Sequence, residues 1–301
     1  MNSWIRRGAI AVITLVVLAA AVVGVATQLA NHKMNRKIEV VVGALAPATE
    51  ATAIERGRYL YASRGCAECH AASGGGRVFV DDGKGLKLAG SHISPGAGSV
   101  TAAYRDEDWV RSIRHGVKPD GRPLMIMPSE DYNRLTDNDM AALIGYLKQM
   151  PATGGGAAVI ELSLSVRTLY GLGAIQDAAA KIDHRLPPQV PVAEGVTVAH
   201  GQYVANMCLG CHGPALAGGK VPGGPPDWPA AARLSPGEGS VMAVRYADAE
   251  PFLKMLKSGQ RPDGSRVGVM PFEALAALSD TDARALHLYL KSLGAQPAAQ
   301  P

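Results

Sequence analysis

The pattern of apolar and polar positions begins with one long uncharged segment. It extends from Ala9 to about Ala30, which is about 22 residues, or roughly 33 Å as a helix. That length is enough to cross the hydrocarbon core of a bilayer. We therefore predict an N-terminal transmembrane anchor over residues 1–38. A cleaved signal peptide is the alternative, although its apolar region is usually shorter, at about 7–15 residues.

Two later segments, "LTDNDMAALIGYLKQM" and "LSDTDARALHLYLKSL", have apolar residues at helical spacing. Apolar residues at i, i+3 and i+4 place one face of a helix against a core. A hydroxyl residue, Thr136 or Ser279, stands three positions before Asp139 or Asp282, close to the pattern of a capping box. Each segment predicts an amphipathic helix capped by its hydroxyl residue.

These helices belong to an internal repeat of about 142 residues. "HISPGAGSV" matches "RLSPGEGSV", and "WVRSIRHGVKPDG" matches "FLKMLKSGQRPDG". Similarity at a fixed period indicates copies of one structural unit. We expect two copies, a first module at residues 50–151 and a second module at residues 197–295. A linker at residues 152–196 joins them and contains one short amphipathic helix, "LSVRTLYGLGAIQDAAA".

Each module is expected to be all-α. Its first helix carries Gly57 and Tyr59, or Gly201 and Tyr203 in the second copy. The glycines allow the first and last helices of a module to approach closely. A further helix is expected over residues 106–115, after a glycine- and proline-rich excursion.

Composition and charge narrow the class of protein. Apolar residues make up 47% of the chain and charged residues 19%, which favours packed domains over disorder. Aromatic residues make up only 5%, so Leu, Val, Ala and Met, or a group that is not an amino acid, must fill the cores. Most of the net charge of +4 lies in residues 1–50, so neither module has the basic patch of a nucleic-acid-binding protein.

All four cysteines fall in two Cys-x-x-Cys-His motifs. The first motif contains Cys66, Cys69 and His70. The second contains Cys208, Cys211 and His212.

Disulfides are one alternative in an exported protein. Paired zinc knuckles usually lie about 15–20 residues apart, much closer than these motifs. Cys-x-x-Cys-His is typical of covalent c-type haem attachment, in which the thiols bond the haem and the imidazole binds iron. From the frequency of His in this chain, finding it after both pairs by chance has odds of about one in a thousand. We therefore predict two covalently bound haems.

Methionine is the expected second axial ligand of each iron. Met127 and Met270 lie 57 and 58 residues after the two motif histidines, and each precedes a proline. Proline fixes the turn and prevents a helix from extending through the ligand. Met125 competes with Met127, but the second module has no counterpart of it.

Further polar residues at matching positions in the two modules are weaker candidates. The carbonyl groups of the "SPG" turns could orient the motif histidines. Some basic residues could either bind haem propionates or be solvated surface charges. The turn residues are Pro95 and Pro236, and the basic residues are His92, Arg233, Arg114 and Lys257.

Each module resembles the class I cytochrome c domain. The whole chain resembles membrane-anchored c-type cytochromes similar to the cytochrome subunits of bacterial alcohol and gluconate dehydrogenases. The resemblance rests on "GRYL", "GCAECH", "IRHGVKPDGRPL" and "LTDNDMAALIGYL" in the first module and their counterparts in the second. Those subunits usually carry three such domains, whereas two repeats are found here.

The resemblance implies tandem cytochrome c domains behind an N-terminal membrane helix, in the bacterial inner membrane and facing the periplasm. It implies an electron carrier rather than an enzyme. Its partners would be a dehydrogenase as donor and an oxidase or another cytochrome as acceptor. A dihaem peroxidase-like enzyme with one open haem site is the alternative, and Glu273 is the acid residue that "GVMPFEAL" would offer it.

Overall fold

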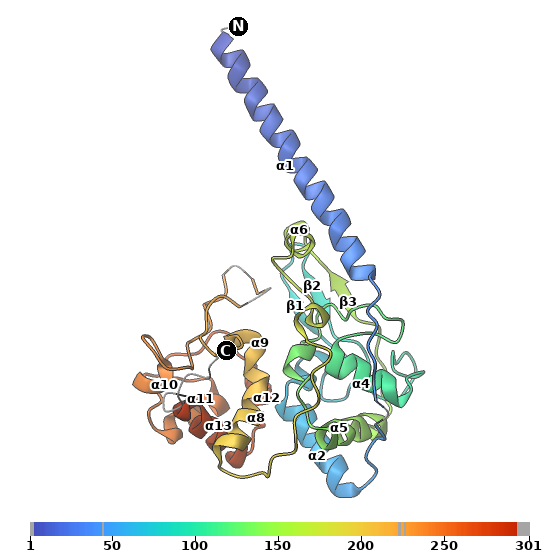
Figure 1. Ribbon diagram of the computed structural model, residues 1–301, viewed down its shortest axis with the longest axis vertical. Helices are drawn as coiled ribbons and strands as arrows, with labels where there is room; N and C mark the ends of the chain where they lie inside the picture. Colours follow the sequence, from blue (N-terminus) through green and yellow to red (C-terminus); the bar gives the residue numbers. More distant parts are fainter. Residues whose placement is uncertain (1–2, 44, 222–223, 226, 294–301) are drawn as a thin grey trace.

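The computed structural model describes residues 3–43, 45–221, 224–225 and 227–293. Residues 1–2 of the predicted anchor and residues 222–223, 226 and 294–295 of the predicted second module lie outside this part of the chain. One long helix projects from a body formed by the remaining elements (Figure 1).

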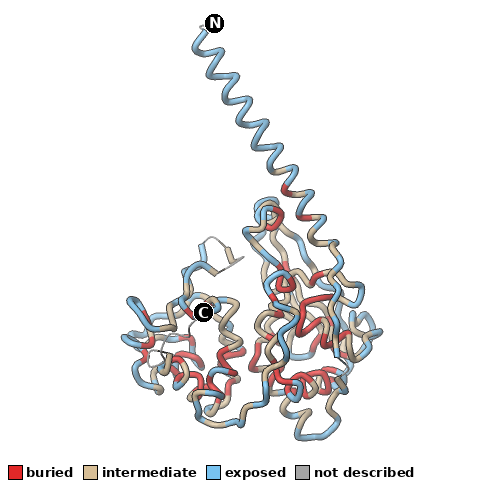
Figure 2. The backbone as a smooth tube through the Cα atoms, viewed as in Figure 1, coloured by how far each residue is buried: buried red, intermediate tan, exposed pale blue. Residues whose placement is uncertain are grey.

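The projecting helix is α1 (Ser3–Asn35). Its mean hydropathy reaches 2.9, and it is long and apolar enough to cross a membrane. Figure 2 shows that it is exposed along most of its length and buried only near the body, at Ala26 and Ala30. This helix contains the whole apolar run that the sequence indicated.

The first module is built around two helices, α2 (Ala51–Ser63) and α5 (Asp137–Gln149), which pack against each other. A Cβ atom at Gly57 would lie 2.1 Å from the carbonyl oxygen of Ala142, so only glycine fits this crossing. The shorter elements are α3 (Cys66–His70), β1 (Val78–Asp81), β2 (Lys87–Ala89), α4 (Asp106–His115) and the 3-10 turn η1 (Ser129–Asp131).

The second module repeats this arrangement with α8 (Val198–Ala205) and α13 (Asp280–Ser292). A Cβ atom at Gly201 would lie 1.9 Å from the carbonyl oxygen of Ala285, the counterpart of the contact at Gly57. The shorter elements are the 3-10 turn η2 (Asn206–Cys208), α9 (Leu209–His212), α10 (Val241–Val244), α11 (Ala249–Ser258) and α12 (Phe272–Ala276).

The predicted helix caps are confirmed. The Thr136 hydroxyl accepts a hydrogen bond from the Asp139 amide at 3.1 Å, and the Ser279 hydroxyl accepts one from the Asp282 amide at 3.0 Å. These bonds satisfy amide groups that the first turn of a helix leaves without a backbone partner. Both capped helices therefore begin where the sequence pattern placed them.

The expectation of an all-α fold is wrong in one respect. A small antiparallel sheet in the order β1–β2–β3 joins the first module to β3 (Val159–Glu161) of the linker. β-Branched and aromatic residues at positions 78–80 precede a glycine-containing turn, which is a hairpin signal. The rest of the described chain is mostly helical.

The linker contains two short helices where one was predicted. They are α6 (Leu164–Leu172) and α7 (Ala178–Lys181). Gly173, with φ of 86°, ends α6 in the left-handed conformation, and the Asp177 carboxylate caps α7. α6 packs on α1, and α7 packs on η1, so the linker is held against the rest of the chain at both helices.

Each module has its own buried core, which appears as red segments in Figure 2. Trp109 and Phe252, at matching positions, are buried in the two cores and act as packing residues. Leucine, methionine and tyrosine supply much of the remaining volume. The first core includes Leu60, Ile113, Met140, Leu143 and Ile144, and the second includes Val204, Leu253, Met255, Leu256 and Leu286.

Candidate haem-attachment sites

The first Cys-x-x-Cys-His motif forms a single short helix. Gly65, with φ of 83°, precedes α3 and allows the chain to turn sharply from α2 into the motif. The His70 Nδ1 atom donates to the Ser91 carbonyl oxygen at 2.8 Å. This bond leaves the Nε2 atom of the imidazole available to bind a metal and fixes the orientation of the ring.

The second motif has the same arrangement, divided between η2 and α9. The His212 Nδ1 atom donates to the Ala232 carbonyl oxygen at 2.8 Å. Burial lowers the pKa of both His70 and His212, which favours the neutral imidazole that ligates iron.

The expectation that proline carbonyl groups orient the imidazoles is wrong. The Pro95 carbonyl oxygen accepts from the Thr153 amide, and the Pro236 carbonyl oxygen accepts from Arg233 Nη1. The residue that lies beside each imidazole is four positions before the proline. The Ser91 and Ala232 carbonyl oxygens are therefore the acceptors.

The four cysteines are free thiols, and none of them forms a disulfide. Burial raises the pKa of Cys66 and of Cys208 to about 12 and that of Cys69 to about 11. Burial also raises the pKa of Cys211. Each motif thus combines two protonated thiols with one oriented neutral imidazole, and this donor set fits a covalently bound c-type haem.

The methionines predicted as second ligands lie against the same apolar clusters as the motifs. Met127 and Cys66 both contact the core of the first module, and Met270 and Cys208 both contact the core of the second. The turn after each methionine is also the same, because the amide two residues later donates to the methionine carbonyl oxygen at 2.9 Å. Met125 is partly buried but is not among the described residues of the cluster, which favours Met127.

Two of the basic residues proposed for haem propionates form ion pairs with aspartates. Arg114 Nη2 lies 2.9 Å from Asp137 Oδ1, and Lys257 Nζ lies 2.7 Å from Asp280 Oδ1. Arg233 Nη1 donates a hydrogen bond to the Pro236 carbonyl oxygen.

His92 is fully buried, and its Nε2 atom lies 3.0 Å from the Ser94 hydroxyl. Its Nδ1 atom has no hydrogen-bond partner within the described part of the chain. Among the proposed propionate contacts, His92 and Arg114 each keep a buried nitrogen without a partner in the described part of the chain, Nδ1 and Nε respectively.

Residues 52–147 match the family described as "Cytochrome C oxidase, cbb3-type, subunit III". This region contains the whole first motif and Met127. The first module is a c-type cytochrome domain. Such a domain implies a covalently bound c-type haem.

The chain is homologous to cytochrome c subunits of alcohol and gluconate dehydrogenases. It is 26% identical over 82% of its length to the gluconate 2-dehydrogenase cytochrome c subunit of Pantoea cypripedii, covering 61% of that protein. It is 28% identical over 81% of its length to the quinone-type alcohol dehydrogenase cytochrome c subunit of Gluconobacter oxydans, covering 55% of that protein.

A nicotinate dehydrogenase subunit of Pseudomonas putida is 28% identical over 83% of the chain, which covers 22% of that protein. The chain thus spans less than two thirds of the length of each of these relatives. All three alignments extend well beyond the matched cytochrome domain.

The motif of the cytochrome domain also contacts the second module. Glu68, inside the first motif, accepts a hydrogen bond from the Ala274 amide at 3.2 Å. The second motif contacts the cytochrome domain in turn, because the Gly210 amide, inside that motif, donates to the Asp131 carboxylate at 2.9 Å. Sequence reasoning missed these contacts, because an acid beside a motif gives no indication of its partner.

Two tyrosines cross between the modules in the same reciprocal way. Tyr59 donates to Asp282 Oδ2 at 2.7 Å, and Tyr203 donates to Asp139 Oδ2 at 2.7 Å. These residues occupy matching positions in the repeat, so the interface has approximate two-fold symmetry. Each tyrosine of a first helix reaches the capped start of the last helix of the other module.

Arg64 of the cytochrome domain is a buried charge at this interface. Its Nη2 atom lies 2.8 Å from Asp282 Oδ2, and its side chain is only 5% exposed. Burial would raise the pKa of Asp282, but Arg64, Tyr59 and His200 together lower it to about 2. The charge of Arg64 also opposes the rise in the pKa of both Cys66 and Cys208, so it acts on a cysteine of each motif.

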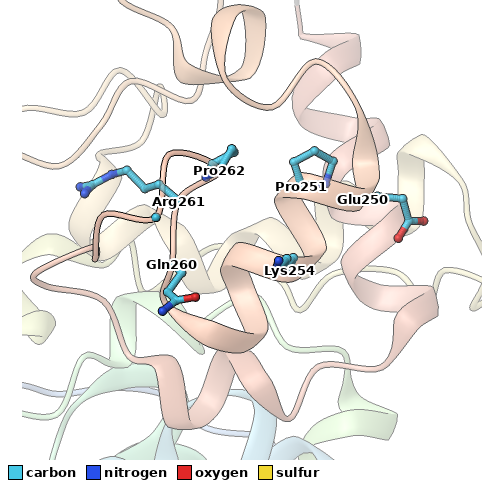
Figure 3. A pocket seen from close by; sticks show the side chains of 7 residues that line it. Glu250, Pro251, Lys254, Gln260, Arg261 and Pro262 are labelled. Atoms are coloured by element: carbon cyan, nitrogen blue, oxygen red, sulfur yellow. The ribbon is translucent and has the colours of Figure 1, made fainter.

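A cleft of about 510 Å³ lies on the second module between α11 and the following loop (Figure 3). Its counterpart on the cytochrome domain is covered by the segment after α1, where the Ile38 amide donates to the Gly121 carbonyl oxygen at 2.9 Å. A Cβ atom at Gly264, which matches Gly121, would have no neighbour within 4 Å among the described residues. The cleft is lined by Glu250, Pro251, Lys254, Gln260, Arg261, Pro262 and Gly264. None of these residues is predicted to bind haem.

Proposed function

We propose that this chain is a dihaem electron carrier that accepts electrons from a dehydrogenase and passes them to a respiratory acceptor. The observation that carries the proposal is the duplicated site, in which a carbonyl oxygen orients the imidazole of each motif and a methionine lies against the same core. The homologous dehydrogenase subunits support the choice of donor.

In the proposed sites, the two haems would be held through thioether bonds to Cys66, Cys69, Cys208 and Cys211. His70 and Met127 would bind one iron, and His212 and Met270 the other. When bound, each haem supplies a one-electron couple whose potential a methionine ligand raises. The Ser91 and Ala232 carbonyl oxygens fix the orientation of the two imidazoles, and each methionine, lying against the same core as its motif, would supply the second iron ligand.

The alternative, a dihaem peroxidase-like enzyme, lacks support. An enzyme of that type needs an open iron site with a free acid or base beside it. Both modules have the same turn after their methionine, and Glu273 Oε2 is paired with Arg77 Nη2 at 2.8 Å. The relatives are named as subunits of dehydrogenases.

We further propose that α1 remains attached and anchors the modules at the periplasmic face of the inner membrane. The end of α1 is part of the fold, since Ala26 and Ala30 are buried and Arg36 forms an ion pair with Asp177 at 2.7 Å. A signal peptide is removed from the mature protein, which would discard the contacts of Ala26 and Ala30. The protein should then remain in the membrane fraction after a high-salt wash.

The number and attachment of the haems can be tested by the mass of the intact protein. The wild-type protein should carry two haems that acidified acetone does not extract. Changing Cys66 and Cys69 together to Ala should leave one haem, and so should changing Cys208 and Cys211. A wild-type protein with a single haem would refute the dihaem proposal.

The axial ligands can be tested in the same preparations. Met127→Ala and Met270→Ala should each allow one reduced haem to bind carbon monoxide, whereas the wild type and the Met125→Ala control should not bind it readily. Full binding to one wild-type haem would identify an open site and would favour the peroxidase-like alternative.

A further inference from the structure

The linker helix α6 packs directly against the membrane-proximal part of α1. A Cβ atom at Gly171 would lie 1.9 Å from the carbonyl oxygen of Ala26, so the two backbones are in close contact. The Lys33 ammonium group donates to the Gly171 carbonyl oxygen at 2.8 Å and to that of Tyr170 at 3.2 Å. These bonds fix α6 at one level along α1.

That level lies inside the apolar run. Ala26 is four residues before Ala30, where the uncharged segment ends, and four residues correspond to about 6 Å along a helix. If α1 crosses a bilayer, the contact at Gly171 therefore lies near the boundary between lipid headgroups and acyl chains. Figure 1 shows α6 at the end of the body from which α1 emerges.

The outward face of α6 carries three exposed leucines, with two hydroxyl residues, Ser165 and Thr168, between them. Leu164, Leu169 and Leu172 are 63%, 44% and 58% exposed. At about 100° per residue, the three side chains lie within an arc of about 140° on the helix surface. Tyr170 is buried on the opposite side of α6. Gly171 lies at the edge of the leucine arc, next to Leu164, where α6 meets Ala26 of α1.

The exposed leucines continue an apolar surface that already faces lipid in the proposed topology. On α1, Val22, Val25 and Leu29 are exposed at nearby levels of the helix. A short helix with leucines on one face and a position at the headgroup boundary has the features of an interfacial membrane helix.

We propose that α6 lies in the membrane interface and that its leucines contact phospholipid. This inference rests on the proposed membrane anchor. Lipid is the occupant that the structure favours, because α1 holds this face of α6 at the level where lipid surrounds α1 itself. The chain would then contact the membrane through two elements, which limits rotation of the first module about α1.

The test uses the full haem-loaded chain in nanodiscs of a zwitterionic phospholipid that contains a diazirine-bearing phospholipid probe. After photolysis, mass spectrometry should locate adducts in residues 164–172 as well as in α1. Leu169→Glu with Leu172→Glu should reduce the adducts in α6 at least fivefold and leave those in α1 unchanged. Val244→Glu, at an exposed site on α10, is the matched control and should alter neither.

The outcomes separate this inference from the anchor proposal. Adducts in α1 without adducts in α6 would overturn the inference and leave the anchor intact. A chain that fails to enter nanodiscs would refute the anchor itself. Protection of α6 only when a dehydrogenase is added would identify a protein, not lipid, as the occupant and would also overturn the inference. Leu172→Ser provides a milder variant if the double substitution prevents folding.

Discussion

At the residue scale, Arg64 is the side chain most directly shared by the two sites. It belongs to the first module, forms an ion pair with Asp282 of the second, and its charge acts at both Cys66 and Cys208. A buried charge is weakly screened by solvent, so its removal has a larger effect than the loss of a surface charge. From this position Arg64 should influence the reduction potentials of both proposed haems.

We predict that Arg64→Met lowers both midpoint potentials, because loss of a positive charge disfavours the reduced state. The expected change is on the order of tenfold in each reduction equilibrium, or about 59 mV for a one-electron couple. Asp282→Asn should shift both potentials upward, and the double variant should lie between the two. Spectroelectrochemical titration measures all of these values.

Arg284→Met is the matched control for this prediction, since Arg284 lies on the same helix α13 as Asp282 but is paired at the surface with Glu250. It should leave both potentials unchanged. A shift of only one potential in Arg64→Met would show that Arg64 influences its own module alone.

At the scale of elements, the sequence was most informative where a local rule applies. Thr136 and Ser279 marked helix starts because a cap involves residues three positions apart. The small sheet was missed because its strands are short and β3 comes from the linker. The break between α6 and α7 at Gly173 was missed because the apolar spacing continued across it.

The close helix crossings at the glycines of α2 and α8 lead to a further prediction. Gly57→Ala should destabilise the first module by about 1–3 kcal/mol, because the added methyl group overlaps the backbone of α5. Gly201→Ala should have the same effect on the second module. Thermal unfolding measures both.

Gly156→Ala serves as the control, since a Cβ atom at Gly156 meets nothing within 4 Å in the described part of the structure. Equal losses of stability at positions 57 and 156 would show that the helix crossing is not the cause.

At the scale of the whole molecule, the repeat predicted two similar modules but not how they pair. Tyr59 and Asp282 are 223 positions apart, and no periodicity connects them. The motif residues could be proposed from the sequence because covalent haem attachment requires a fixed spacing of cysteine and histidine. The contacts between the modules depend on surface complementarity, for which a single sequence contains no comparable rule.

The aspartates of the interface should make the free energy of unfolding decrease at low pH. The pKa of Asp282 is lowered to about 2 from an ordinary value of 3.8, and that of Asp139 is also lowered. A carboxyl group whose pKa is lower in the folded state stabilises the fold at any pH above its pKa in the unfolded state. This stabilisation is lost as the pH falls through the pKa of the folded state. We expect Asp282 to account for a loss of about 2 kcal/mol between pH 4 and pH 2.

Denaturant unfolding across that pH range measures the loss, and Asp282→Asn should show a smaller dependence on pH. Asp280→Asn is a suitable control because Asp280 is exposed on the same helix and pairs with Lys257 at the surface. An unchanged pH dependence in Asp282→Asn would assign the acid sensitivity to other groups.

The reciprocal tyrosine contacts give the interface the geometry of an isologous dimer, in which one surface patch meets its own copy. In a homodimer, any substitution in that patch occurs on both sides at once. Covalent linkage of the two copies removes this constraint, because each side can change alone. The two sides of the interface do differ. Arg56 pairs with Asp139 within the first module, whereas His200 occupies the matching position beside Asp282 in the second. Fusion has thus allowed a symmetric contact to become an asymmetric pair of electrostatic environments.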